Sequence, residues 1–414
     1  MTTTPSIREA RVRRVALPAL QTRLIATRVD LLLVLPLILA PLNSDGALGF
    51  IATPTTKVLG GALALAGAVL LLLEHRSRPP VPLFWTLVVL LVGLLLTTSL
   101  LRELPVQRYL LIGQYLALLG SVLVWVSVRP QRVLGVLYTS SLIHLVLAVL
   151  FHTYVPWEDG GVRLGGGSHP LVLGFEASVV IIISLVALIR PGGGWRRPMF
   201  AVITGYAVYV LLQAFARQAL ISISIALVLL MFLLPGPWRW VRAYLAIALA
   251  ASVFVWLGAD GIAGLLGAER ASDLASATGR TEIWARILQL LPEFAGFGYG
   301  YFALNDADGP DALVFFASHG APAENALLQV TLDGGVAGAV VWLGVLVAGV
   351  VVVLRARGVS RIMGIAMLPL FLSSITVASG LAGEGVQWWW FLGVVTEAGV
   401  SAQVLRRPLV EPDL

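Results

Sequence analysis

The sequence predicts an all-α polytopic membrane protein, and three observations lead to this fold class. The mean hydropathy is +0.91, and 58% of the residues are hydrophobic. Only 12% are charged, whereas a soluble domain carries about 25%. Apolar runs of roughly 17 to 25 residues, long enough to cross a bilayer as a helix, recur along the chain. We therefore expect about 12 transmembrane helices in a single membrane domain over residues 1–414.

The apolar runs give each expected span its place in the chain. In order, the spans are 28–46, 58–73, 81–101, 107–128, 133–151, 169–190, 199–215, 218–234, 241–258, 325–354, 360–380 and 386–404. Pro36 and Pro41 interrupt the first run, because proline breaks the helical hydrogen-bond pattern. Trp388, Trp389 and Trp390 open the last span, where aromatic rings are expected to anchor in the headgroup zone.

The distribution of basic residues predicts the orientation of these spans. With the N-terminus in the cytoplasm, the inside segments hold 20 of the 28 arginines and lysines, and the outside segments hold 8. Basic residues concentrate on the cytoplasmic side of membrane proteins, so both termini are expected there. The longest connection, residues 259–323 between helices 9 and 10, then forms a large external loop, and its length indicates a functional insertion.

The composition also excludes several kinds of chemistry. The chain has no cysteine and only five scattered histidines, so thiolate nucleophiles are excluded, and we expect no metal site and no cofactor. The net charge of +6 favours contact with membrane lipids, because basic residues in a membrane protein set its topology and bind headgroups. We expect no binding of nucleic acid.

Polar chemistry gathers in one stretch, from Thr278 to Gly338. Its motifs, in order, are Gly279-Arg280-Thr281-Glu282-Ile283-Trp284, Pro292 with Gly296, Gly298 and Gly300, Ser318-His319-Gly320, Asn325-Ala326-Leu327-Leu328-Gln329, and Gly335 with Gly338. This order resembles the O-antigen ligase and polymerase family of bacterial envelope enzymes. The resemblance implies transfer of a glycan from undecaprenyl diphosphate to a hydroxyl on the periplasmic side of the inner membrane, without an obligatory metal. The external loop is then periplasmic.

Arg217 and Arg280 are the residues expected to bind the donor diphosphate. Arg217 lies between two apolar runs at the external surface, on a tight hairpin or a broken helix, and membrane arginines usually face a cavity or a partner. Arg280 is expected to begin a helix, where backbone N–H groups and a cation together form an anion site. Planar guanidinium groups bind phosphate oxygens bidentately, and the resemblance implies a functional arginine at Arg217. Contact with lipid headgroups is the alternative for both.

His319 is the expected catalytic base. It lies in the external loop shortly before Asn325, and the resemblance implies a histidine in this loop. A neutral imidazole can accept a proton from a sugar hydroxyl near neutral pH. Many relatives place the histidine directly before the asparagine, whereas Glu324 occupies that position here. Glu324 is therefore the alternative base.

The helix start after this loop adds further candidates. Asn325 and Gln329 are four residues apart and are expected on one helix face. They either bind sugar or phosphate, or they join neighbouring helices by hydrogen bonds. Gly335 and Gly338 are expected to be packing positions or a local break.

The remaining candidates come from two other external segments. Arg163 and His169 are expected to line the external cavity. Arg163 is followed after ten residues by Gly174, a spacing that resembles a motif of O-antigen polymerase loops. Glu384, in the last external loop, is a candidate for acceptor binding.

The resulting prediction is a glycosyltransferase of the ligase type. It would take an undecaprenyl-diphosphate-linked O-antigen donor and a lipid A core acceptor, and it would act by an inverting displacement. One long external loop rather than two favours the ligase over the alternatives, an O-antigen polymerase or a protein O-oligosaccharyltransferase. Asp30, Glu176 and Glu397 lie in or near spans, where ionisable groups indicate function, and they make a proton-coupled transporter the more distant alternative.

Overall fold

The computed structural model describes part of every expected span except 241–258. The described residues are 30–39, 54–74, 81–101, 106–152, 154–156, 162–165, 169–189, 196–214, 216–234, 280–294, 296–300, 325–375 and 385–404. Most of the expected external loop 259–323 therefore lies outside the described residues.

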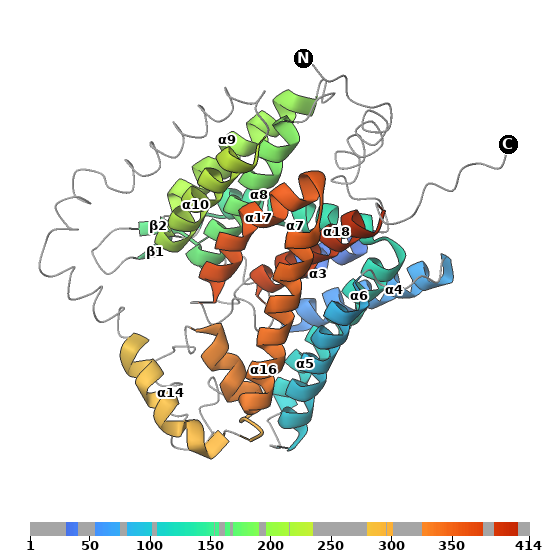
Figure 1. The fold of residues 1–414 in the computed structure, drawn as a ribbon, viewed down its shortest axis with the longest axis vertical. Coiled ribbons are helices and arrows are strands. Elements are labelled where there is room, and N and C mark those ends of the chain that lie inside the picture. Colours follow the sequence, from blue (N-terminus) through green and yellow to red (C-terminus); the bar gives the residue numbers. More distant parts are fainter. Residues whose placement is uncertain are drawn as a thin grey trace, which may run out of the picture.

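Helices account for nearly all of the described chain (Figure 1). They are α3 (Leu31–Leu39), α4 (Pro54–Glu74), α5 (Pro82–Leu101), α6 (Val106–Val128), α7 (Val133–Leu150), α8 (Pro170–Ile189), α9 (Arg196–Ala214), α10 (Arg217–Leu233), α14 (Arg280–Phe294), α16 (Ala326–Arg355), α17 (Gly358–Ser374) and α18 (Val386–Val404). A short 3-10 helix, η1 (Pro130–Arg132), precedes α7. Strands β1 (Tyr154–Pro156) and β2 (Val162–Leu164) form an antiparallel pair before α8.

Five helical stretches are long and apolar enough to cross a membrane. They are Thr55–Leu73, Pro82–Leu101, Pro130–Leu150, Pro170–Leu188 and Ala326–Arg355. Shorter apolar stretches include Gln218–Leu233 and Gly358–Ser374, and the first expected span is represented by the nine-residue α3 with Pro36 inside it. The predicted helical membrane protein is thus confirmed in outline, while the number of twelve helices and the large external loop remain predictions.

The described core is built around α8. This helix is the most enclosed of the five long ones, and it packs against α7, α9, α10, α17 and α18. Residues 179–183 of α8 are buried without exception, as expected of a helix that is apolar on every side. By contrast, α4 exposes Leu59, Val69 and Leu73 on its outer side. A polar side chain on α8 must therefore find its partners inside the protein.

The tryptophans at the start of α18 are buried, which corrects their expected role as headgroup anchors. Trp388, Trp389 and Trp390 are each at most 2% exposed. The ring of Trp389 lies 5.7 Å from that of Tyr115 in α6, and the ring of Trp388 stacks on Phe391 at 6.3 Å, measured between centroids. The physical reason is that α18 packs against α7, α8, α16 and α17, so its first turn meets other helices instead of lipid.

α16 consists of two parts that join at Gly335. This glycine has φ 69° and ψ −170°, which interrupts the helix and is one of the two roles expected for it. Before the break, residues 329–335 are all buried. After the break, an exposed apolar stripe begins at Val336 and continues at helical spacing through Val340, Leu343 and Val347. The first part of α16 is enclosed by protein, and the second presents a lipid-facing side.

Candidate functional site

Arg217 is the first residue of α10, and the backbone before it is tightly confined. α9 ends at Ala214, and Ala216 is extended, with φ −80° and ψ 96°. This is the tight connection that the sequence predicts. Gly174 of α8 faces it, and a Cβ on Gly174 would lie 2.7 Å from the Cβ of Ala216 and 3.0 Å from that of Ala219. Because those distances are too short for two carbons, only glycine at 174 lets the start of α10 lie this close to α8.

The starts of α10 and α16 both bind to the last turn of α17. The side-chain amide of Gln218, next to the start of α10, donates a hydrogen bond to the carbonyl oxygen of Ser373. The backbone N–H of Ala326, the first residue of α16, donates to the carbonyl oxygen of Ile375 at 2.7 Å. The helix that begins at Arg217 and the helix that follows Asn325 are thus joined at one point of the bundle.

Asn325 and Gln329 both have structural partners. Asn325 is the N-cap of α16, and its Oδ1 accepts from the backbone N–H groups of Leu327 at 3.0 Å and Leu328 at 3.2 Å. Such a cap satisfies backbone donors that the helix cannot. Gln329 is 3% exposed, and its Nε2 donates to Oδ1 of Asp333 at 2.8 Å. This bond of Gln329 runs along α16 itself.

The loop after α14, residues 298–300, is hydrogen-bonded to α16 at its break, and we call this contact the lock. The backbone N–H groups of Tyr299 and Gly300 donate to the carbonyl oxygens of Leu332 at 2.6 Å and Asp333 at 3.0 Å. Figure 1 shows α14 beside the lower part of α16, below the group of α8, α9 and α10. Since α14 begins at Arg280, this lock sets where the helix that carries Arg280 can lie relative to α16.

Two glycines with positive φ make the lock possible. Gly298 has φ 54° and Gly335 has φ 69°, a region that residues with a Cβ rarely adopt. A Cβ on Gly298 would lie 2.5 Å from the carbonyl oxygen of Asp333, and one on Gly335 would lie 2.5 Å from that of Gly296. Glycine at these two positions therefore lets the two backbones approach more closely than any residue with a Cβ would allow.

Asp333 is a buried acid at the centre of this lock, and sequence reasoning did not single it out. Its carbonyl oxygen accepts from Thr98 Oγ1 of α5 and from Gly300 N–H, both at 3.0 Å. Its carboxylate accepts from Gln329, and the residue is 1% exposed. The signal in the sequence was an acid inside the expected span 325–354, four residues after Gln329. In a membrane span such an acid must have a buried partner.

Arg163 lies in the strand pair that precedes α8, and His169 lies between that pair and α8. Arg163 pairs with Val155 across the two strands. His169 directly precedes α8, where its Nδ1 accepts from the N–H of Leu171 at 3.3 Å and its carbonyl oxygen accepts from that of Val172 at 2.9 Å. The imidazole is exposed. His169 thus caps α8, and its expected place in a cavity remains a prediction.

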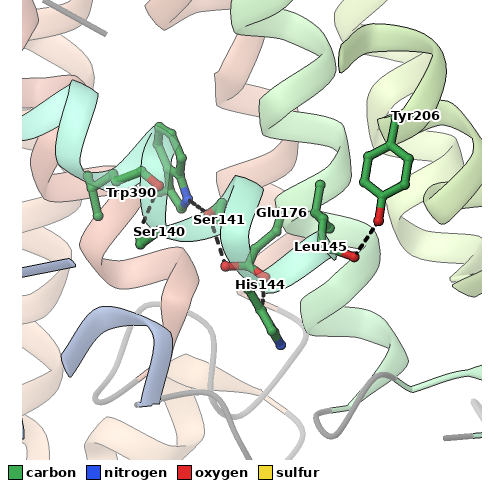
Figure 2. A network of polar contacts seen from close by, with 8 residues as sticks. Ser140, Ser141, His144, Leu145, Glu176, Tyr206 and Trp390 are labelled. Atoms are coloured by element: carbon green, nitrogen blue, oxygen red, sulfur yellow. Dashed lines mark hydrogen bonds and ion pairs between the residues drawn. The ribbon is translucent and has the colours of Figure 1, made fainter. Parts of the chain in front are cut away.

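A second polar cluster joins α7, α8 and α18 (Figure 2). Ser141 Oγ donates to Oε1 of Glu176 at 2.9 Å and accepts from Nε1 of Trp390 at 3.0 Å. Nδ1 of His144 binds the other carboxylate oxygen, Oε2. His144 is 0% and Glu176 is 2% exposed. We call Ser141, His144, Glu176 and Trp390 the buried network.

The sequence singled out Glu176 but missed His144. His144 lies seven residues before the end of the expected span 133–151, and Glu176 lies seven residues after the start of the next, 169–190. Two consecutive antiparallel spans place such residues at equal depth. Because an acid inside a membrane needs a partner, the matching depths would have identified His144 as the partner of Glu176.

Three predicted residues lie outside the described residues: His319, Glu324 and Glu384. Their roles remain predictions, as do the diphosphate contacts of Arg217 and Arg280. Among the residues that the structure does describe, no three His, Cys, Asp or Glu side chains are grouped closely enough to hold a metal ion.

Comparison with known proteins finds a similarity to one family. A family model described as O-antigen ligase matches residues 200–343. The match begins in α9, contains Arg217, Arg280 and His319, and ends in α16, so it covers the motifs that carry the resemblance. No curated protein and no solved structure matches the chain.

Proposed function

We propose that this chain, whose residues 200–343 match the O-antigen ligase family model, is an O-antigen ligase of the bacterial inner membrane. It transfers a glycan from undecaprenyl diphosphate to a sugar hydroxyl of lipid A core. The whole chain forms one membrane domain with cytoplasmic termini, and residues 259–323 form its periplasmic loop. The observation that carries the proposal is the family match, which spans both arginines and the loop histidine.

The geometry of the described helices supports a single site built from distant parts of this segment. The helix that begins at Arg217 and the cap residue Asn325 share the last turn of α17 through the Gln218–Ser373 and Ala326–Ile375 hydrogen bonds. The lock between residues 298–300 and α16 ties in the helix that begins at Arg280. Rigid backbone anchors of this kind suit groups that must be held in one orientation for catalysis.

The proposed reaction is one in-line displacement with inversion at the anomeric carbon. His319 takes the proton from the acceptor hydroxyl as the new glycosidic bond forms. The bond from the anomeric carbon to the diphosphate oxygen breaks, and Arg217 and Arg280 bind the charge that develops on undecaprenyl diphosphate. Fixed cations in a partly dehydrated site stabilise such charge more strongly than in water, so the arginines take the place of a metal.

The test is transfer by the purified full chain in lipid nanodiscs. With an undecaprenyl-diphosphate-linked glycan and lipid A core, we expect glycan-bearing core, free undecaprenyl diphosphate and an inverted anomeric configuration, each measurable by mass spectrometry and NMR. Elongation of the lipid-linked glycan in place of transfer to core would identify a polymerase instead. Transfer to a protein hydroxyl would identify a protein O-oligosaccharyltransferase.

A further inference from the structure

The buried network is a polar cluster in the described core that the proposed reaction does not use. Glu176 lies six residues into α8, about 9 Å along the helix from its first residue. It is bound by Ser141 and His144, both on α7, and Ser141 in turn accepts a hydrogen bond from Trp390 on α18. Burying a carboxyl group inside a membrane protein is costly, so a buried acid that joins α8 to α7 directly and to α18 through Ser141 indicates a requirement for a particular helix arrangement.

The hydrogen bonds of the network have a fixed direction. An indole N–H can only donate, so the Ser141 hydroxyl accepts from Trp390 and must give its own hydrogen to Glu176. Oε1 of Glu176 is therefore an acceptor. Since Ser141 is hydrogen-bonded to both α8 and α18, a rotation of α8 would break at least one hydrogen bond of the buried network.

The opposite side of α8 packs against the start of α10. Gly174, two residues before Glu176, contacts Ala216 and Ala219 on either side of Arg217. Successive residues of a helix are about 100° apart, so Gly174 and Glu176 point to nearly opposite sides of α8. The rotation of α8 that places Glu176 against α7 is thus the same rotation that turns the bare backbone of Gly174 toward α10.

An aromatic layer connects the network to the same region by a second route. The ring of Phe371 in α17 lies 6.1 Å from that of Phe175 and 5.4 Å from that of Phe391. Phe175 and Phe391 are the chain neighbours of Glu176 and Trp390. Two residues after Phe371, Ser373 accepts the hydrogen bond from Gln218. Two contacts hold the start of α10: the packing of Gly174 against Ala216 and Ala219, and the hydrogen bond from Gln218 to Ser373. Both therefore lie next to the buried network.

From this arrangement we infer that Glu176 is a positioning residue for Arg217. Its bonds to Ser141 and His144 hold α8 in the rotation that packs against the first turn of α10, and so they fix the backbone position of Arg217, the residue proposed to bind the donor diphosphate. The inference rests on the proposed function, because it takes Arg217 as a diphosphate ligand. Glu176 itself touches no substrate in this account.

The test is a double-mutant cycle on donor affinity, with undecaprenyl diphosphate as the probe and the full chain in nanodiscs. We expect Glu176→Ala to raise the dissociation constant by about tenfold, equivalent to about 1.4 kcal/mol. In the Arg217→Ala background the same change should have no further effect, because residues that act through one contact are not additive.

Conservative variants separate positioning from charge. In Glu176→Gln the amide oxygen still accepts from Ser141, and the amide nitrogen donates to Nδ1 of His144 in its other tautomer. We expect Glu176→Gln to restore the affinity that Glu176→Ala loses. Comparing His144→Asn with His144→Ala makes the same test on α7. This pair of variants replaces the Glu176 pair if Glu176→Ala does not fold.

Tyr138→Phe is the matched control. The hydroxyl of Tyr138 bonds Ser184 at 2.8 Å, which is another buried hydrogen bond between α7 and α8, but about 12 Å further along α8 from Glu176. Removing it should lower the thermal stability and leave donor affinity unchanged. An equal loss of affinity in Tyr138→Phe and Glu176→Ala would show a general weakening of the bundle and would overturn the inference.

The remaining outcomes distinguish the two proposals. If Arg217→Ala weakens binding while Glu176→Ala does not, or if the two losses add, the positioning role is wrong and the diphosphate role of Arg217 stands. If Arg217→Ala binds undecaprenyl diphosphate as well as the unaltered chain does, the diphosphate role itself fails, and the inference fails with it.

Discussion

At the scale of single residues, a sugar hydroxyl attacks poorly until a base takes its proton, and we assign that task to His319. We expect His319→Ala to lower the transfer rate by about 10² to 10⁴ fold, the range for a general base, while donor binding is unchanged. The measurement is the initial rate of glycan transfer to lipid A core. Glu324→Ala is the matched control, and a large loss there with normal transfer in His319→Ala would assign the base to Glu324.

The proposed role of the two arginines depends on the geometry of the guanidinium group as well as on its charge. Arg217→Lys and Arg280→Lys keep the charge but lose the planar pair of donors that fits phosphate oxygens. We expect each to weaken binding of undecaprenyl diphosphate by about tenfold, because a hydrogen bond to a charged group contributes about 1.5 to 3 kcal/mol. Arg286→Lys is the control on α14, since Arg286 contacts Gln289 at an exposed position. Unchanged binding in both test variants would assign the arginines to headgroup contact.

Residue types alone left some roles open because the same atoms serve two purposes. Asn325 Oδ1 and His169 Nδ1 both accept from backbone N–H groups at helix starts, and the same lone pairs would accept from a sugar hydroxyl. Which use applies depends on where the helix begins to within one residue. Hydropathy locates a span only to within a few residues, so the caps became visible only with the fold.

At the scale of helices, the lock between residues 298–300 and α16 depends on glycine. We expect Gly335→Ala to destabilise the protein by about 1 to 3 kcal/mol, the cost of a strained backbone conformation, to which the clash with the carbonyl of Gly296 adds. Thermal unfolding in detergent measures the loss. Gly344→Ala, in the same helix, is the control, because its new Cβ meets only Leu87 at 3.9 Å. Equal midpoints for the two variants would show that the lock contributes little.

Hydropathy predicted where the described α-helices other than α14 lie, but not what each side of them meets. Every expected span other than 241–258 contains a described helix, because length and apolarity alone decide whether a segment can cross a bilayer. The same apolar composition suits lipid and protein neighbours equally. The burial of Trp390 therefore could not be deduced from the runs themselves, whereas the pairing of His144 with Glu176 could have been inferred from their equal depths in consecutive spans.

At the scale of the whole molecule, a ligase and a polymerase leave different intermediates when the gene is removed. Loss of a ligase should leave lipid A core uncapped while long glycan collects on undecaprenyl diphosphate, because chain growth precedes transfer. We expect this phenotype, measured by gel profiles of lipopolysaccharide and mass spectrometry of the lipid-linked pool. Core carrying a single repeat would instead identify a polymerase, and it would leave the roles of His319, Arg217 and Arg280 unchanged.

The break in α16 also makes the protein sensitive to the thickness of its bilayer. Twenty residues run from Val336 to Arg355, which is about 30 Å of helix and equals the thickness of a typical hydrocarbon core. The exposed apolar stripe begins directly after Gly335, so we expect the lock at Asp333 to lie near the end of the acyl chains. In a thicker or thinner membrane this second part of α16 must tilt or the lipid must deform, and either change strains the lock. Transfer rates in bilayers of graded acyl-chain length should therefore pass through a maximum near this match.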